Sequence, residues 1–338
     1  MRDLKELTTE ELKAVLAGLG QPAFRAKQIR KWMLSGAESF SEMSNLPQAL
    51  REKLASEYSW SGLTIERLQQ SVDGTRKYLL GLPDGEKVEA VFMVYDYGNS
   101  ICLSTEVGCP MGCRFCASTI GGKVRELSAW EILYEYLTVQ KDAGAPISHI
   151  VLMGIGEPFD NYAQVSRFLE DVHDPEGVGL SYRNITVSTC GIVPKIRQFG
   201  EDFPQVNLAI SLHASTQEER EALMPVAKAY SMDELIAACR EHAEKTGRRV
   251  SFEYTLISGK NDGKNNALRL ASLLSGMLCH VNLIPLNPVR ENGMSGSDRD
   301  QAENFRKLLE EHGIPATVRR TLGTDIDAAC GQLRRNSR

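Results

Sequence analysis

The 338-residue sequence contains no run of about 18 uncharged apolar residues, which is the length needed to cross a bilayer. Its first residues, Met1 to Glu6, lack the apolar stretch of a secretory signal. The net charge is only -5, so no global excess of positive charge indicates a nucleic-acid partner. No internal repeat or low-complexity tract is evident. We therefore expect a globular, cytoplasmic protein that does not contact a membrane.

The eight cysteines are the first positive feature. A cytoplasmic compartment keeps thiols reduced, so a disulfide framework is not expected and the spacing indicates metal binding or catalysis. Cys190, Cys239 and Cys279 fit small buried hydrophobic positions beside predicted strands and helices. The other five cysteines carry the functional argument.

Three regions follow one another along the chain. Residues 1–60 show helical patterns, with Thr8 and Glu11 forming a capping box, and predict a small accessory domain. Residues 61–98 predict a linking β-hairpin around a Pro-Asp-Gly turn. Residues 99–338 alternate apolar strands with amphipathic helices, two of which open with the capping boxes of Ser128 and Ser231. The six expected strands are 101–105, 147–153, 185–189, 206–212, 250–256 and 281–286. This alternation predicts an α/β fold with a parallel sheet, either doubly wound or a full or partial barrel.

Cys109, Cys113 and Cys116 follow the first of these strands with the spacing C-x3-C-x2-C. Three thiolates on one loop can surround a compact metal centre. A structural zinc site is the alternative, but zinc needs four ligands and no second pair lies nearby in the sequence. The spacing, with Phe115 before the last cysteine, resembles the radical S-adenosylmethionine superfamily. The resemblance implies one [4Fe-4S] cluster, S-adenosylmethionine on its open iron, and a partial (βα)6 barrel.

Polar residues gather where the later strands end, as in an active site on a barrel rim. In this superfamily they imply contacts to S-adenosylmethionine, with the Gly-x-Gly-Glu-Pro segment meeting its ammonium group. The expected cofactor-binding residues are Gly156, Glu157, Ser188, Ser211, Leu212, His213 and Asn287. Taken alone, a Gly-x-Gly fits a tight turn equally well, and a single histidine is commonly structural.

Two further cysteines narrow the comparison. Cys102 precedes the cluster motif, and Cys330 lies in Asp-Ile-Asp-Ala-Ala-Cys-Gly-Gln-Leu near the C-terminus. With the other motifs in this order, the chain resembles the dual-specificity ribosomal and transfer RNA adenine carbon-2 methyltransferases over nearly its whole length. The related adenine carbon-8 methyltransferases of the antibiotic-resistance type share these motifs, so the sequence leaves carbon 2 and carbon 8 open.

The resemblance implies a reaction that consumes two S-adenosylmethionine molecules per turnover. One methylates Cys330, and the second yields a radical that activates the new S-methyl group for addition to adenine. Cys102 then attacks the Cys330 sulfur and leaves a transient disulfide. Glu89 matches the family position assigned to removal of the ring proton, although an isolated glutamate in a hairpin is usually a surface charge.

The implied substrates are 23S rRNA and tRNA, and the implied electron donor is a flavodoxin or ferredoxin; a monomer is expected. RNA contacts are predicted from the cluster Arg25, Lys27, Arg30 and Lys31 with Trp32, and from the arginine-rich segment 315–338. Both segments are equally compatible with solvated surface.

Two rival functions remain open at this level. One is a radical enzyme of the same superfamily that acts on a peptide or small molecule, with Cys330 on an auxiliary cluster, although a single extra cysteine is too few for one. The other is a zinc-stabilised RNA-binding protein in which His213 or Cys102 completes the metal site.

Overall fold

The computed structural model of the protein describes residues 1–334. The chain begins with a helical module of η1 (Leu4–Glu6), α1 (Thr9–Gly18), α2 (Phe24–Leu34), η2 (Phe40–Glu42) and α3 (Gln48–Glu57). Its first capping box is formed as predicted, because the Glu11 amide donates to the Thr8 hydroxyl and the Thr8 amide donates to the Glu11 carboxylate. The apolar residues of these helices pack into a core separate from that of the sheet, so the module has its own hydrophobic centre.

A buried lysine joins this module to the rest of the protein. The Nζ atom of Lys5 lies 3.0 Å from Oδ1 of Asp3 and 4.4 Å from the ring centroids of both Trp60 and Trp130. Trp130 belongs to α4 (Ala129–Ala143) beside the sheet. Burial lowers the pKa of Lys5, and Asp3 opposes that shift. The desolvated ammonium is therefore compensated by one carboxylate and two aromatic faces, which hold the module against α4.

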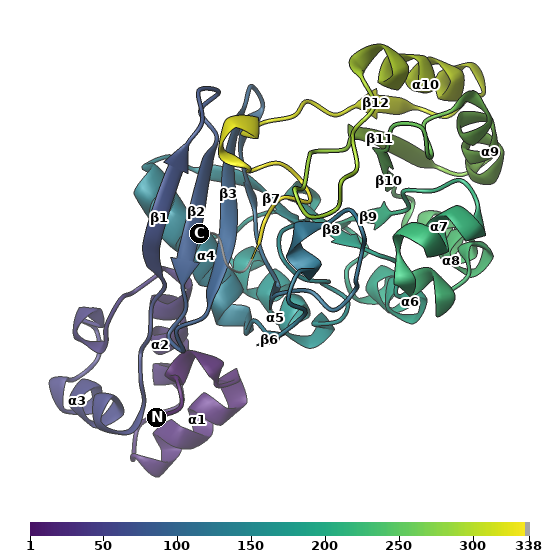
Figure 1. The fold of residues 1–338 in the computed structure, drawn as a ribbon. Helices are drawn as coiled ribbons and strands as arrows, with labels where there is room; N and C mark the ends of the chain where they lie inside the picture. Colours follow the sequence, from purple (N-terminus) through teal and green to yellow (C-terminus); the bar gives the residue numbers. More distant parts are fainter. Residues whose placement is uncertain (335–338) are drawn as a thin grey trace.

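A single ten-stranded sheet forms the body of the protein (Figure 1). Its first part is antiparallel and consists of β1 (Thr64–Gln70), β2 (Arg76–Gly81), β3 (Lys87–Tyr95) and β4 (Gly98–Cys102). Its second part continues in parallel from β4 through β7 (Ile147–Leu152), β8 (Ile185–Thr189), β9 (Asn207–Ser211), β10 (Val250–Leu256), β11 (Cys279–Pro285) and β12 (Ala316–Val318). Within the described residues β12 does not pair with β1, so the barrel is open.

The expected α/β architecture is confirmed, with several differences in detail. The parallel part has a seventh strand, β12, beyond the six that were expected. The predicted hairpin of β2 and β3 forms, but it gains β1 and pairs through β3 with β4, so it extends the barrel sheet. The first parallel strand starts earlier than expected, at Gly98, and ends at Cys102, because residues 103–105 already turn toward the cysteine loop. That loop also contains a small ladder of β5 (Glu106–Val107) and β6 (Arg125–Glu126), whose two-residue strands are too short for a periodicity signal.

Helices cover the outer face of the parallel strands (Figure 1). After α4 they are α5 (Tyr162–His173), α6 (Val193–Asp202), α7 (Gln217–Leu223), α8 (Met232–Thr246), α9 (Lys264–Leu274) and α10 (Arg299–Glu311), and the short turns are η3 (Ala117–Thr119), η4 (Tyr182–Asn184), η5 (Pro225–Lys228) and η6 (Thr324–Ile326). The predicted capping boxes at Ser128 and Ser231 open α4 and α8. No helix among residues 1–334 has the length and apolar character required to cross a bilayer.

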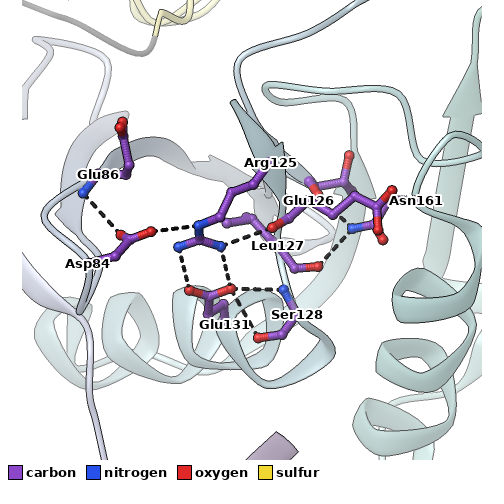
Figure 2. A network of polar contacts seen from close by, with 9 residues as sticks. Asp84, Glu86, Arg125, Glu126, Leu127, Ser128, Glu131 and Asn161 are labelled. Carbon is purple, nitrogen blue, oxygen red and sulfur yellow. Dashed lines mark hydrogen bonds and ion pairs between the residues drawn. The ribbon is translucent and has the colours of Figure 1, made fainter. Parts of the chain in front are cut away.

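Figure 2 shows how the β2–β3 turn is fixed to β6 and to the start of α4. Arg125 on β6 forms two 2.9 Å contacts with Glu131 and one of 2.6 Å with Asp84 in the turn. Glu131 also accepts from the Ser128 amide at the start of α4. A bidentate arginine at the centre of this network fixes the orientation of the hairpin as well as its distance from α4. The same hairpin contacts residues 323–331, which carry Cys330 and are called the Cys330 segment below.

Candidate active site

The carboxyl ends of the parallel strands surround a cavity that contains most of the predicted site. Its walls include the cysteine loop, the ends of β7 to β11 and the segment around Cys330. Of the predicted residues, it is lined by Cys109, Cys113, Cys116, Gly156, Glu157, Ser188, Ser211, His213, Asn287 and Cys330. We call it the cluster cavity. Residues from six separate parts of the chain therefore meet at one end of the barrel, as parallel-strand topology predicts.

The cysteine loop is shaped by tight backbone packing. Gly108 has a φ of +79°, and a Cβ atom there would lie 1.9 Å from the carbonyl oxygen of Gly122, so only glycine fits before Cys109. Burial raises the pKa of Cys109 to about 12 and that of Cys113 well above its usual value, and the neighbouring cysteines act in the same direction. Thiols this desolvated require a metal charge to ionise.

The three thiols suit a cluster better than a single ion. Within residues 1–334, no three His, Cys, Asp or Glu side chains already stand in the geometry of one bound metal ion. In a [4Fe-4S] cluster each thiolate binds a different iron, so its ligands stand farther apart than the ligands of zinc. His213 and Cys102 do not complete a zinc site with the triplet in this structure.

The Gly-x-Gly-Glu segment packs against Thr105 and Glu106, just before the cysteine loop. Gly156 has a φ of +110°, and a Cβ atom there would lie 2.7 Å from Oγ1 of Thr105. The buried Glu157 carboxylate accepts from the amides of Cys190 (2.7 Å) and Phe159 (3.0 Å). Burial raises the pKa of Glu157, and these amide donors partly oppose the shift. The carboxylate is thus oriented by backbone donors on the cavity wall.

The fourth strand places its predicted residues differently. Ser211 lines the cavity, whereas the side chain of Leu212 is fully buried in the hydrophobic core and lies outside the lining. His213 adopts a φ of +55°, and its Nδ1 accepts from the Thr255 amide at 3.0 Å. Burial lowers the pKa of His213 to about 3, so the ring is neutral and holds the end of β9 beside β10.

The Cys330 segment is held from several sides. Asn287 donates to the Cys330 carbonyl oxygen at 3.1 Å, and the Gly331 carbonyl accepts from the Ala117 amide at 2.8 Å. From the other side, Asp73 accepts from the Gly323 amide at 2.9 Å and Lys77 donates to the Asp327 carbonyl at 3.1 Å. Figure 1 shows this segment in yellow, reaching from β12 to the β1–β3 strands. Cys330 therefore lies between the β1–β3 strands and the cysteine loop, and its segment is hydrogen-bonded to both.

Cys102 and Cys330 share a second, adjoining cavity, which we call the thiol cavity. The walls of the two cavities share Met153, Ile284, Asn287, Arg319 and Cys330, so the two spaces lie on either side of these residues. Both cysteines carry free thiols. Burial raises the pKa of Cys102 to about 12, Cys330 adds to this shift, and Arg319 opposes it.

Glu89 lies outside the lining of both cavities. It is buried, which differs from the usual surface position of a hairpin glutamate, and its carboxylate lies 3.3 Å from the Lys77 ammonium. The Arg334 amide donates to the same carboxylate at 2.8 Å. The residues after Cys330 thus separate Glu89 from the thiol cavity in this structure.

Two residues of the cavity walls, and one buried neighbour of Cys190, were not predicted from sequence. Arg319 was counted only as part of a basic tail, and Cys190 as a structural residue; both line the cluster cavity. Arg220 is fully buried, and its Nη2 donates to the Cys190 carbonyl at 2.6 Å while its Nε and Nη1 have no hydrogen-bond partner among the described residues. Its charge interacts with Cys113. The sequence offers no signal for a buried arginine on an otherwise charged helix.

The predicted basic cluster of α2 faces the barrel in part. Arg30 forms an ion pair with Asp171 of α5, and Lys31 lies 3.3 Å from Glu176. Arg25 donates to the Asn45 carbonyl, and the Trp32 ring nitrogen donates to the Asn45 side chain. These interactions stabilise the module itself and reduce the charge left for phosphate. Arg335 and Arg338 of the predicted basic tail lie outside the described residues.

Comparison with known proteins gives two family matches. A family described as the ribosomal RNA large subunit methyltransferase N-terminal domain matches residues 2–59, and the radical SAM superfamily matches residues 103–271. A protein of Clostridium perfringens strain SM101 named "Probable dual-specificity RNA methyltransferase RlmN" is 52% identical over 99% of this chain and 97% of its own length. A protein of Pelotomaculum thermopropionicum with the same name is 51% identical over 98% of this chain and 91% of its own. The crystal structure of a radical SAM methyltransferase from Sphaerobacter thermophilus matches with a TM-score of 0.93 and 44% identity, over 99% of this chain and 100% of that one.

Proposed function

Because this chain belongs to the RlmN family of radical SAM dual-specificity RNA methyltransferases, we propose that it methylates carbon 2 of adenine in both 23S rRNA and tRNA. The observation that carries the proposal is that Cys330 lies where the cluster cavity and the thiol cavity meet. One thiol can therefore face a cofactor on one side and a second thiol, with a substrate base, on the other. Members of the radical SAM superfamily use a [4Fe-4S] cluster and S-adenosylmethionine.

The residues present fit both groups. Cys109, Cys113 and Cys116 would hold one cluster, because all three line the same cavity and lie close enough for Cys109 and Cys116 to raise the pKa of Cys113. The wall formed by Gly156, Glu157, Ser188, Ser211 and Asn287 would hold S-adenosylmethionine, with the Glu157 carboxylate facing its ammonium group. When bound, these groups supply a 5'-deoxyadenosyl radical, and the chemistry is theirs while the protein positions it.

Cys330 would accept a methyl group from a first S-adenosylmethionine and carry it as S-methylcysteine, so two cofactor molecules are used per turnover. The hydrogen bond from Asn287 to the Cys330 carbonyl holds the backbone that carries this side chain. The methyl carbon would lose a hydrogen atom to the 5'-deoxyadenosyl radical and bond to the adenine ring, which then loses its ring proton and one electron. Cys102 would next attack the Cys330 sulfur, so that the sulfur–carbon bond breaks, the methylated RNA leaves and a disulfide forms, which an external reductant reopens. The high pKa of Cys102 keeps it protonated and prevents early attack.

Glu89 would remove the ring proton only after the Cys330 segment moves. Its carboxylate is capped by the Arg334 amide, so binding of RNA must displace residues near 333 and 334 before the base can reach it. An adenine must also leave its stack to enter a recessed cavity. The proposal further includes a flavodoxin or ferredoxin as electron donor, a monomeric enzyme, and a cytoplasmic location with its RNA substrates.

Two cysteine variants test the mechanism. In Cys330→Ala we expect neither methylation of the protein by S-adenosylmethionine nor modification of RNA. In Cys102→Ala we expect a methylated Cys330 and a covalent protein–RNA adduct that accumulates, because addition to the base precedes disulfide formation. Mass spectrometry of tryptic peptides and of digested RNA measures both, and the modified nucleoside distinguishes carbon 2 from carbon 8. Turnover in Cys330→Ala, or no adduct in Cys102→Ala with an intact cluster, contradicts the proposal.

A further inference from the structure

We propose that Tyr95 and Tyr97 form a stacking platform for the RNA base next to the target adenine, at the solvent end of the thiol cavity. The inference rests on the proposed function, because it assumes that the target adenine enters this cavity to reach Cys330. It concerns a binding surface on the β3–β4 turn, away from the cluster loop and from the N-terminal helical module.

The two rings lead from the cavity wall to solvent. Tyr95 ends β3 and belongs to the lining of the thiol cavity with Cys102 and Cys330. Its hydroxyl donates to the Met93 sulfur at 3.7 Å, and burial raises its pKa. The ring of Tyr97, in the following turn, is stacked on that of Tyr95 with centroids 4.9 Å apart and planes inclined by 11°. This stack therefore begins with a ring in the wall of the cavity that both thiols line and continues to an exposed ring.

The outer ring is held in place but left open. The rings of Tyr97 and His149 on β7 form an edge-to-face pair with a centroid distance of 5.2 Å and an angle of 84°. Tyr97 is nevertheless 65% exposed, and Val94 near the end of β3 is 47% exposed. A tyrosine that served only to close the apolar cluster beneath the turn would bury its ring, because burial is the source of its stabilisation. A ring fixed on two sides and exposed on the rest loses little freedom when a flat partner binds.

A base of the RNA substrate can be this flat partner. An adenine that leaves its stack to reach a recessed site deprives the neighbouring base of a stacking partner, and an aromatic side chain at the entrance can replace it. The exposed Arg320 lies on the wall of the same cavity and offers a positive charge to a phosphate. The exposed Asp96 between the two tyrosines repels phosphate, so the sugar-phosphate backbone is expected on the Arg320 side. The continuity of the stack with the cavity favours a nucleic-acid base over a protein partner here.

The test compares Tyr97→Leu, which removes the ring, with Tyr97→Phe, which keeps it. Tyr182→Leu is a matched control, because Tyr182 is stacked on His173 at 3.9 Å on another surface. The probe is a synthetic RNA stem-loop that the wild-type enzyme methylates at one loop adenine. We expect the dissociation constant to rise about 5- to 100-fold in Tyr97→Leu, with little change in Tyr97→Phe or Tyr182→Leu. Equal RNA affinity in Tyr97→Leu and Tyr97→Phe overturns the proposal.

Abasic RNAs identify the contact. If Tyr97 stacks on a neighbouring base, removing that base on one side of the target adenine should weaken wild-type binding and abolish the difference between wild type and Tyr97→Leu. If the difference persists with both abasic RNAs, the ring does not stack on a neighbouring base and the platform is wrong. Normal RNA binding with slower reduction of Tyr97→Leu by flavodoxin reassigns the patch to a protein partner.

A separate readout distinguishes this proposal from the function on which it rests. Methylation of Cys330 by S-adenosylmethionine without RNA should proceed at the wild-type rate in all three variants. Failure of the wild-type enzyme to methylate Cys330 counts against the proposed function. Normal Cys330 methylation with unchanged RNA affinity counts against the platform alone.

Discussion

Arg319 and Glu253 form an ion pair in the wall of the cluster cavity, with Nη1 of the arginine 3.7 Å from Oε2 of the glutamate. Glu253 is fixed in turn by Asn282, which donates to its other oxygen at 2.8 Å. Arg319 also lines the thiol cavity. The negative charge of an ionised Cys330 is the leading influence that raises the pKa of Arg319, and Glu253 adds to it. The ion pair therefore places a fixed guanidinium beside the cysteine that is proposed to accept the methyl group.

The first prediction concerns this guanidinium. We expect Arg319→Gln to slow RNA-independent methylation of Cys330 by about 10- to 100-fold, because contacts to a charged group contribute about 1.5–3 kcal/mol. Rapid-quench mass spectrometry of the Cys330 peptide measures the rate. Arg306→Gln on the exposed face of α10 is the control for loss of an ion-paired arginine. If the single variant unfolds, Arg319→Gln with Glu253→Gln leaves no buried unpaired charge. An undiminished rate in a folded variant contradicts the assigned role.

The second prediction separates the cluster ligands from a fourth thiol. Cys190 lines the same cavity as the triplet, but its amide is bound to Glu157 and its position follows a different strand. Cys190→Ala should keep about four iron atoms per chain after anaerobic reconstitution, whereas alanine at Cys109, Cys113 or Cys116 should remove most of the iron. Iron and sulfide analysis with visible absorption measures this. Loss of iron in Cys190→Ala equal to that in Cys113→Ala would make Cys190 a ligand.

The third prediction distinguishes two roles for Asn287. Glu157→Ala and Ser188→Ala should weaken S-adenosylmethionine binding by on the order of 1 to 3 kcal/mol, since each removes a polar wall group. Asn287→Ala removes the bond to the Cys330 carbonyl and should lower the rate of Cys330 methylation about fivefold with a smaller effect on cofactor affinity. Equilibrium binding and single-turnover rates give the two quantities. A large loss of affinity with an unchanged rate would place Asn287 on the cofactor.

The fourth prediction uses Glu106, which lies below the Gly-x-Gly-Glu segment. Burial raises the pKa of Glu106 to about 7, and Lys123, 2.8 Å away, opposes the shift. A folded-state pKa above the usual 4.5 means that the folded protein binds the proton more tightly, so stability falls as pH rises from about 4.5 to 7. Glu106→Gln keeps an acceptor for the Glu157 amide and removes the titration. The unfolding free energy of the variant relative to wild type should rise across this range in denaturant titrations of the iron-free protein.

If the difference in unfolding free energy between Glu106→Gln and wild type does not change between pH 4.5 and 7, Lys123 fully compensates the cost of burying the ionised Glu106. Lys123→Met then provides the matching test. Without the ammonium group to stabilise the ionised Glu106, the unfolding free energy of the protein should fall more steeply as the pH rises over the same range.

The sequence alone was sufficient for the elements whose signals are local. Capping boxes at Thr8, Ser128 and Ser231 and the continuous apolar strands depend on residues within a few positions of one another, and all are present. The cysteine triplet and the Cys330 motif are likewise short and contiguous, so they indicated the family that the comparisons then showed.

Tertiary structure decided what depends on contacts across the chain. The capping of Glu89 by residue 334 and the bond from Asn287 to the Cys330 carbonyl each join segments whose spacing carries no periodic signal. In the sequence, Arg319 is one arginine of a basic tail. In the structure it follows β12, forms an ion pair with Glu253 and lies between the two cavities. Charge, burial and hydrogen bonding at such positions are set by neighbours distant in sequence, so local patterns of amino acids cannot specify them.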